Sequence, residues 1–141
     1  MKDFFILEVC GLKIEGLPIS QVSRWLPAYI ASTIKQNVSF MAVDPETDKI
    51  VGVSVNIIKS KDTINLSMMD YLDPSVEPIM CQIARFLGHL NKEVETPTTS
   101  EKILMILFLN VESHYGGRGI AQELTKKSED YAVSIGINSF Q

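Results

Sequence analysis

The sequence has few of the features that would place it outside ordinary soluble globular proteins. It has only two cysteines, Cys10 and Cys81, far apart and in no metal-binding spacing, so we expect reduced structural thiols and no bound metal. No run approaches the roughly 20 apolar residues that span a bilayer. The apolar stretch "FFILEVCGL" contains Glu8 and is not followed by small residues typical of a cleavage site. These absences predict a soluble, cytoplasmic protein without a membrane partner.

Basic charge is also scarce. The net charge is −4 and the isoelectric point is near 5.1, so no basic face is available to pair with the phosphates of a nucleic acid. A local site for a small anion remains compatible with this balance. With 141 residues, of which 45% are hydrophobic, the chain is long enough for one domain, 1–141, with its own core.

The order of sequence patterns predicts an α+β sandwich on a mostly antiparallel sheet. An N-terminal strand should be followed by a helix over 18–36, kinked or divided at Pro27. The predicted elements after it are a β-hairpin over 39–58, a helix over 75–95 capped by Ser75, a strand over 103–109, a helix from Gly119 to 135, and the start of a strand over 137–141. Trp25 and Tyr29, four residues apart, should lie in the core.

Apolar spacing predicts which face of each long helix is buried. In the helix over 75–95 the expected stripe is Ile79, Ile83, Phe86, Leu87 and Leu90. In the last helix it is Ile120, Leu124, Tyr131 and Ile135. Residues 103–109 are apolar throughout, which is typical of a central strand covered on both faces. Gly136 stands where a left-handed helix cap is expected.

A glycine cluster, Gly116-Gly117-Arg118-Gly119, lies between that strand and the last helix. A strand, glycine turn and helix often direct backbone N–H groups at an anion. The candidates are a dinucleotide, a nucleoside triphosphate, or the pyrophosphate of coenzyme A. The alternative is a plain packing junction whose glycines serve only tight curvature.

Two of these candidates fail on spacing. In a G-x-G-x-x-G pattern starting at Gly117, the third glycine would fall on Gln122, and no second strand with an acidic residue follows. A Walker A loop requires Gly-Lys-Ser/Thr, which is absent from the chain. A coenzyme A site or a packing junction remains.

The frame Gly116-Gly117-Arg118-Gly119-Ile120-Ala121, after a strand ending in Leu109-Asn110-Val111, resembles the signature of the GNAT superfamily of acyl-CoA N-acyltransferases. That signature reads Arg/Gln-x-x-Gly-x-Gly/Ala, and here Gly116 replaces Arg or Gln at its first position. The hairpin over 39–58 and the run "RGIAQELT" are similar to arylalkylamine N-acetyltransferases of the insect dopamine-acetylating kind.

This resemblance implies an enzyme that transfers an acetyl group from acetyl-CoA to a primary amine, such as dopamine or serotonin, without a metal. The pantetheine arm would lie along Leu109, Asn110 and Val111. The pyrophosphate would be held by Gly116, Gly117, Arg118, Gly119, Ile120 and Ala121. Glu8 in "FFILEVC" would be the general base that deprotonates the amine. The alternative for Glu8 is a solvent-facing residue at a strand edge, because Val9 stands where the family has proline and Leu7 where an acid is common.

Two further expectations follow from the resemblance. The family's domain continues past the last helix with further strands, so the chain covers about its first three-quarters. The alternative function is therefore a catalytically inactive protein that binds coenzyme A weakly or forms a homodimer through the sheet edge beside 103–109. His114, in the turn, is expected to be a solvated loop residue, and His89 to be half exposed.

Overall fold

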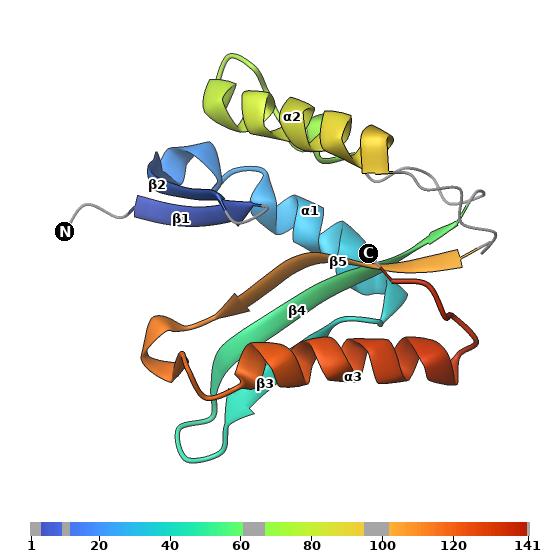
Figure 1. Ribbon diagram of the computed structural model, residues 1–141. Helices are drawn as coiled ribbons and strands as arrows, with labels where there is room; N and C mark the ends of the chain where they lie inside the picture. The colour runs from blue at the N-terminus through green and yellow to red at the C-terminus, as the bar shows by residue number, and fades with distance from the viewer. Residues whose placement is uncertain (1–3, 10–11, 61–66, 95–101, 141) are drawn as a thin grey trace. The chain divides into compact units, whose positions relative to one another are not determined.

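A computed structural model of the chain (Figure 1) describes residues 4–9, 12–60, 67–94 and 102–140, and the side chains of 17–60, 67–90 and 102–140. The chain divides into two compact units, which we describe separately. The first comprises Met1–Ile30 and Leu66–Thr96, and the second comprises Ala31–Asn65 and Pro97–Gln141. The assignment of 1–141 to one domain stays a prediction.

The first unit begins with an antiparallel pair of strands. The expected N-terminal strand is β1 (Phe4–Val9), and its partner β2 (Leu12–Pro18) was not predicted. The remaining elements are η1 (Ile19–Gln21), α1 (Leu26–Thr33), which continues into the second unit, η3 (Met68–Tyr71) and α2 (Pro78–Val94).

The region predicted as a helix over 18–36 is divided rather than kinked: η1 ends at Gln21 and α1 begins at Leu26, so the break lies just before Pro27. Pro27 lies in the first turn of α1, where its missing N–H leaves no helical hydrogen bond unmade. A separate 3₁₀ turn, η2 (Ile34–Gln36), follows α1. Trp25 and Tyr29 are buried as predicted, with 2% and 3% of their surface exposed. The ring of Tyr29 packs against both Trp25 and Tyr71, with centroids 5.8 and 5.3 Å apart.

A buried carboxylate fixes the start of α2. Glu77 is fully buried and accepts two hydrogen bonds from Arg24, from Nε and Nη2, both at 2.7 Å. It also accepts one from the N–H of Asp73 at 2.9 Å. The prediction that Ser75 caps this helix is wrong, because its hydroxyl donates to the Asp73 carboxylate at 2.6 Å. The first helical hydrogen bond runs from the N–H of Cys81 to the carbonyl of Glu77. Pro78 favours this start because it occupies the first helical position.

The buried face of α2 differs from the predicted stripe. Met80, Cys81 and Ala84 are buried, whereas Ile79 and Phe86 are 43% and 51% exposed. Spacing alone did not identify this face, because it depends on which neighbours the helix contacts, here η1 and η3. Cys81 is a free thiol, as expected, and Cys10 lies outside the described residues.

The second unit is a three-stranded antiparallel sheet with one long helix beside it (Figure 1). The strands are β3 (Phe40–Asp44), β4 (Lys49–Ser60) and β5 (Lys102–Val111), in the order β3-β4-β5. The predicted hairpin is confirmed as β3 and β4. A 3₁₀ turn, η4 (Ser113–Tyr115), leads to α3 (Ile120–Ser134), which contacts all three strands. The predicted α+β sandwich on an antiparallel sheet is confirmed.

The central strand is β4, and the prediction that residues 103–109 form a strand covered on both faces is wrong. In β4, Val51 and residues 54–57 are buried, whereas in β5 only Leu104 is fully buried. An unbroken apolar run therefore did not mark the middle of the sheet. The expected start of a further strand is present: Leu104 forms a parallel bridge with Phe140, and its N–H donates to Ser139 at 3.0 Å.

A buried polar network joins β4 to α3. The Asn56 amide nitrogen donates to the carbonyl of Val38 and to the hydroxyl of Ser128, both at 2.8 Å. Its amide oxygen accepts from the hydroxyl of Ser54 at 2.8 Å, and Ser128 donates to the carbonyl of Leu124 at 2.8 Å. The side chains of Asn56, Ser54 and Ser128 are completely buried, so these hydrogen bonds replace the ones lost to water.

The buried face of α3 agrees with the prediction only in part. Leu124 is buried as predicted, together with Ser128 and Ala132, whereas the predicted Tyr131 and Ile135 are 38% and 45% exposed. A serine thus occupies the middle of the buried stripe, which an apolar pattern does not reveal. The cap at Gly136 is confirmed: its φ is 85°, and the N–H of Ile137 returns to the carbonyl of Ala132 at 2.8 Å.

Gly52 lets α3 approach β4 closely. A Cβ atom at this position would lie 3.0 Å from Cγ2 of Ile120 and 3.2 Å from Cδ1 of Leu124. The first turn of α3 therefore packs directly on the backbone of the central strand. Any larger side chain at Gly52 would displace the start of the helix or force its side chains into strained rotamers.

We expect Gly52→Val to destabilise the second unit by about 1–3 kcal/mol through overpacking against Ile120 and Leu124. Hydrogen exchange of the α3 amides and chemical denaturation should both detect the change. Gly88→Ala is the matched control: nothing lies within 4 Å of a Cβ atom on Gly88, which is in α2, so this change should stabilise by about 0.5–1 kcal/mol. Unaltered exchange in Gly52→Val would contradict the close packing.

We expect the stability of the first unit to depend on the ionisation of Glu77. Hydrogen bonds from Arg24 lower the pKa of Glu77 below its ordinary value, with burial opposing them. The ionised group therefore stabilises the fold above the unfolded pKa of about 4.3, and this contribution is lost as the pH falls through the lower folded pKa. Glu77→Gln should lower the urea midpoint at pH 7, and the gap to the parent chain should narrow below about pH 4.

The fluorescence of Trp25, the only tryptophan, reports this unfolding from within the first unit. Asp70→Asn, which changes the same charge on an exposed side chain in η3, is the control and should leave the midpoint nearly unchanged. A gap between Glu77→Gln and the parent that stays constant from pH 7 to pH 3 would show that ionisation is not the cause.

Candidate functional site

The turn between β5 and α3 contains two glycines that the backbone requires. Gly117 has a φ of 73° and Gly119 a φ of 77°, a left-handed region in which L side chains are strained. Gly116 has an ordinary extended conformation, with φ −60° and ψ 155°, and a Cβ atom there would meet only the Ser113 carbonyl oxygen, at 3.2 Å. The backbone angles therefore demand glycine at 117 and 119, whereas at 116 the angles suit any residue and a Cβ atom would make a tight contact with the Ser113 carbonyl oxygen.

The turn presents a row of unused backbone donors. Within the described residues, the N–H groups of 117–122 have no hydrogen-bond acceptor, and the first bond of α3 runs from Glu123 N to the Gly119 carbonyl at 3.0 Å. The first N–H groups of a helix carry partial positive charge. Glycines at 117 and 119 also leave these amides open to close approach. This arrangement suits an anionic ligand.

A hollow of about 350 Å³ lies at this turn. It is lined by Val111, Tyr115, Gly116, Gly117, Gly119, Ile120, Ala121 and Gln122. The structure thus gathers most of the residues that the sequence pointed to at the turn, and Arg118 lies between two of them on the exposed surface. Tyr115 and Gln122 were not predicted, although both are neighbours of the glycine cluster in the sequence.

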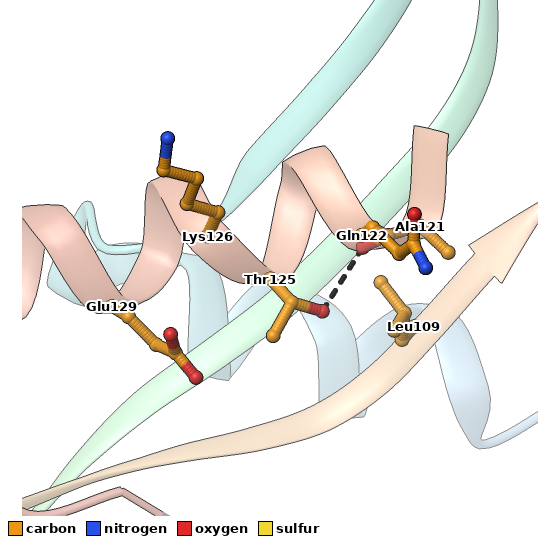
Figure 2. Close-up of a pocket in the computed structure, with 6 residues that line it drawn as sticks. All are labelled: Leu109, Ala121, Gln122, Thr125, Lys126 and Glu129. Carbon is orange, nitrogen blue, oxygen red and sulfur yellow. Dashed lines mark hydrogen bonds between the residues drawn. The ribbon is translucent and has the colours of Figure 1, made fainter. Parts of the chain in front are cut away.

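A second hollow of about 320 Å³ adjoins the first between β5 and α3. Figure 2 shows its lining: Leu109, Ala121, Gln122, Thr125, Lys126 and Glu129. The Thr125 hydroxyl donates to the carbonyl of Ala121 at 3.0 Å, so this side chain is turned along the helix. Ala121 and Gln122 line both hollows, so the two lie next to each other at the start of α3.

The end of β5 lies beside these two hollows, which are lined by Val111 and Leu109 respectively. The N–H of Glu112 donates to Val51 at 2.8 Å, and Val111 is opposite Gly52 in the ladder. In an antiparallel pair, alternate residues direct their N–H and C=O toward the partner strand. Asn110 therefore faces β4 with its backbone, whereas Leu109 and Val111 direct theirs away from it. Of the three predicted residues, Leu109 and Val111 thus have backbone groups on the open side of β5, and the binding role of all three stays a prediction.

A tyrosine links the turn to the β3–β4 hairpin. The Tyr115 hydroxyl donates to Oδ2 of Asp44 at 2.5 Å, and this bond lowers the pKa of the Asp44 carboxyl and raises the pKa of the Tyr115 phenol. The guanidinium carbon of Arg118 lies 4.9 Å from the centre of the Tyr115 ring. Asp44 was not predicted as a site residue, because 71 positions separate it from Tyr115 and no local pattern connects them.

The remaining predicted residues are less informative. Glu8 belongs to β1 in the first unit, opposite Lys13 in the strand register, and its side chain lies outside the described residues, so its role stays a prediction. His114 is exposed in η4, as expected for a solvated loop residue, and His89 is exposed on α2. No described helix is long and apolar enough to cross a membrane.

Comparison with known proteins identifies the fold. No family model and no curated protein matches the chain. Among solved structures, arylalkylamine N-acetyltransferase 2 from Aedes aegypti is similar, with a TM-score of 0.67 and 30% identity over 79% of this chain. The chain belongs to the GNAT superfamily. A mosquito arylalkylamine N-acetyltransferase-like 5b protein, at 16% identity and a TM-score of 0.63 over 86% of the chain, shares the fold.

The chain spans 52% of the first of these GNAT proteins and 62% of the second. The structural similarity confirms the predicted resemblance to the insect arylalkylamine group at the level of family and fold. The chain is shorter than either structure, so their activities are carried to it only as a proposal.

Proposed function

We propose that this chain binds acetyl-CoA at the glycine turn and transfers its acetyl group to a primary amine. The observation that carries the proposal is the row of N–H groups at 117–122, which have no acceptor in the described chain and border a hollow of about 350 Å³. The open N–H groups favour this over a mere packing junction, since tight curvature alone accounts for the left-handed glycines but does not require open donors.

The chain's own residues suit the parts of such a ligand. The amides of the turn, at the positive end of α3, would hold the pyrophosphate. The backbone groups of Leu109 and Val111 would bind the pantetheine arm as an added strand. Acetyl-CoA would supply an acetyl group already activated as a thioester: the amine nitrogen would bond to the acetyl carbon, the C–S bond would break, and coenzyme A would leave as its thiolate. The N–H of Val111, turned away from β4, would then be placed to stabilise negative charge that develops on the acetyl oxygen.

The amine is proposed to be an arylalkylamine, on the names of the similar mosquito proteins. A protonated amine cannot attack a thioester, so a general base is needed, and Glu8 is the proposed base. Binding without transfer is the second candidate function. It is favoured by Gly116, where the side chain of the Arg or Gln of the family signature is missing.

We expect the chain to bind acetyl-CoA in calorimetry, and Gln122→Glu to weaken that binding about tenfold. The new carboxylate would face the proposed pyrophosphate, and tenfold corresponds to a repulsion of about 1.4 kcal/mol. The fold should not suffer, because an acidic residue in the first turn of a helix is favourable.

Asn138→Asp is the matched control for this charge change. It adds the same negative charge on an exposed residue beyond the C-terminal end of α3, and it should leave the dissociation constant nearly unchanged. Equal affinities for the parent chain and Gln122→Glu would place the anion elsewhere, and no binding by the folded parent would remove the proposal.

We expect Glu8→Gln to lower kcat/KM for an arylalkylamine about 10²–10⁴-fold at neutral pH, with the dissociation constant for acetyl-CoA unchanged. The activity of the variant should rise as the pH increases and more of the amine is deprotonated without help. Steady-state assays over a pH series would measure both effects. A parent chain that binds acetyl-CoA and acetylates no amine would instead support binding without transfer.

A further inference from the structure

The Tyr115 side chain stands between an anion and a cation. Its hydroxyl donates to Asp44 at 2.5 Å, and the guanidinium of Arg118 lies over its ring at 4.9 Å. Tyr115 itself lines the hollow at the glycine turn. The three side chains come from the β3–β4 hairpin, from η4 and from the glycine turn, all within the second unit.

Arg118 has no other partner in the described part of the chain. Its side chain is exposed and makes no hydrogen bond or ion pair there, so its five N–H donors are open to a ligand. It lies between Gly117 and Gly119, both of which line the hollow. A long side chain normally loses rotamer freedom when it binds a ligand. Contact with the Tyr115 ring already restricts the Arg118 rotamers, so less conformational entropy is lost on binding.

Asp44 strengthens this arrangement in two ways. Its hydrogen bond fixes the Tyr115 ring, which otherwise rotates about the side-chain bonds. A phenol that donates to a carboxylate also carries more electron density, and a ring with a more negative face attracts a cation more strongly. Asp44 therefore acts on Arg118 through the ring, without touching it.

We propose that Tyr115, held by Asp44, is a positioning residue that presents the Arg118 guanidinium to a phosphate group bound at the rim of the hollow. The inference rests on the proposed function, because coenzyme A carries the phosphates, either its pyrophosphate or its ribose phosphate. Tyr115 and Asp44 do not bind the phosphate themselves. Their effect reaches the ligand only when Arg118 is present.

The test is a double-mutant cycle on the dissociation constant for coenzyme A, measured by calorimetry on the full chain. Arg118→Gln and Tyr115→Leu should each weaken binding about threefold to tenfold, and the double variant should bind no more weakly than the weaker single variant. Tyr115→Phe, which keeps the ring and loses the bond to Asp44, should show a smaller loss. When Arg118→Gln is already present, adding Tyr115→Phe should cause no further loss of affinity. If the hydroxyl had only a structural role, Tyr115→Phe would weaken binding equally with and without Arg118.

Two controls separate this effect from general changes in charge and packing. Lys35→Gln removes a cation from η2. This turn lies at the end of β4 away from Gly52, because its Gln36 side chain accepts a hydrogen bond from the N–H of Ile58. Tyr131→Leu removes an aromatic ring from α3 that packs on Phe40. Neither should change the dissociation constant. Dephospho-coenzyme A identifies the phosphate: a loss in Arg118→Gln that disappears with this ligand assigns Arg118 to the ribose phosphate, and an equal loss assigns it to the pyrophosphate.

The outcomes distinguish this inference from the proposed function. If the parent binds coenzyme A and Arg118→Gln binds equally well, or if the two single losses multiply in the double variant, the positioning role is overturned and the cofactor site stands. If the parent binds inorganic pyrophosphate with the same coupling but not coenzyme A, the positioning role stands and the proposed function fails. If the parent binds neither ligand, both fail.

Discussion

The Asn56 amide is the interaction on which the second unit depends. It is fully buried, and its nitrogen and oxygen bond to Val38, Ser128 and Ser54. Each serine hydroxyl has one proton, and both protons are used, by Asn56 and by the Leu124 carbonyl, so their mutual contact at 3.4 Å is not needed. Because an unpaired buried polar atom costs about 1–3 kcal/mol, only one register of α3 on β4 satisfies this group.

That register places the candidate site. Ser128 is eight residues from Ile120, or about 12 Å along the helix, and Ile120 packs over Gly52 on the same strand as Asn56. Two contacts on one strand define the helix axis and therefore the direction of its first N–H groups. The hydrogen bond from Tyr115 to Asp44, the last residue of β3, then fixes the turn that precedes the helix. The open donors are thus held by packing at both sides of the turn.

Local patterns predicted the parts of this site, and long-range contacts decided how the parts are used. The hairpin, the glycine turn and the cap at Gly136 depend on neighbours in sequence, and each was found where the residues indicated. The predicted buried faces of α2 and α3 were only partly right, because the contacts that decide them are distant in the sequence: α2 packs on η1 and η3, and Ser128 is buried against a partner 72 positions away. The link from Asp44 to Tyr115 was missed for the same reason.

The departure at Gly116 bears on how the chain would hold an anion. The backbone angles there are ordinary for any residue, but a Cβ atom would lie 3.2 Å from the Ser113 carbonyl oxygen, a tight contact that only a small shift of the turn would relieve. Between Glu112 and Ala121 the only arginine or lysine is Arg118, and its guanidinium is held over a ring that is itself fixed to a carboxylate. A cation two positions along the turn, restrained by Tyr115, can therefore supply the positive charge that the first signature position lacks.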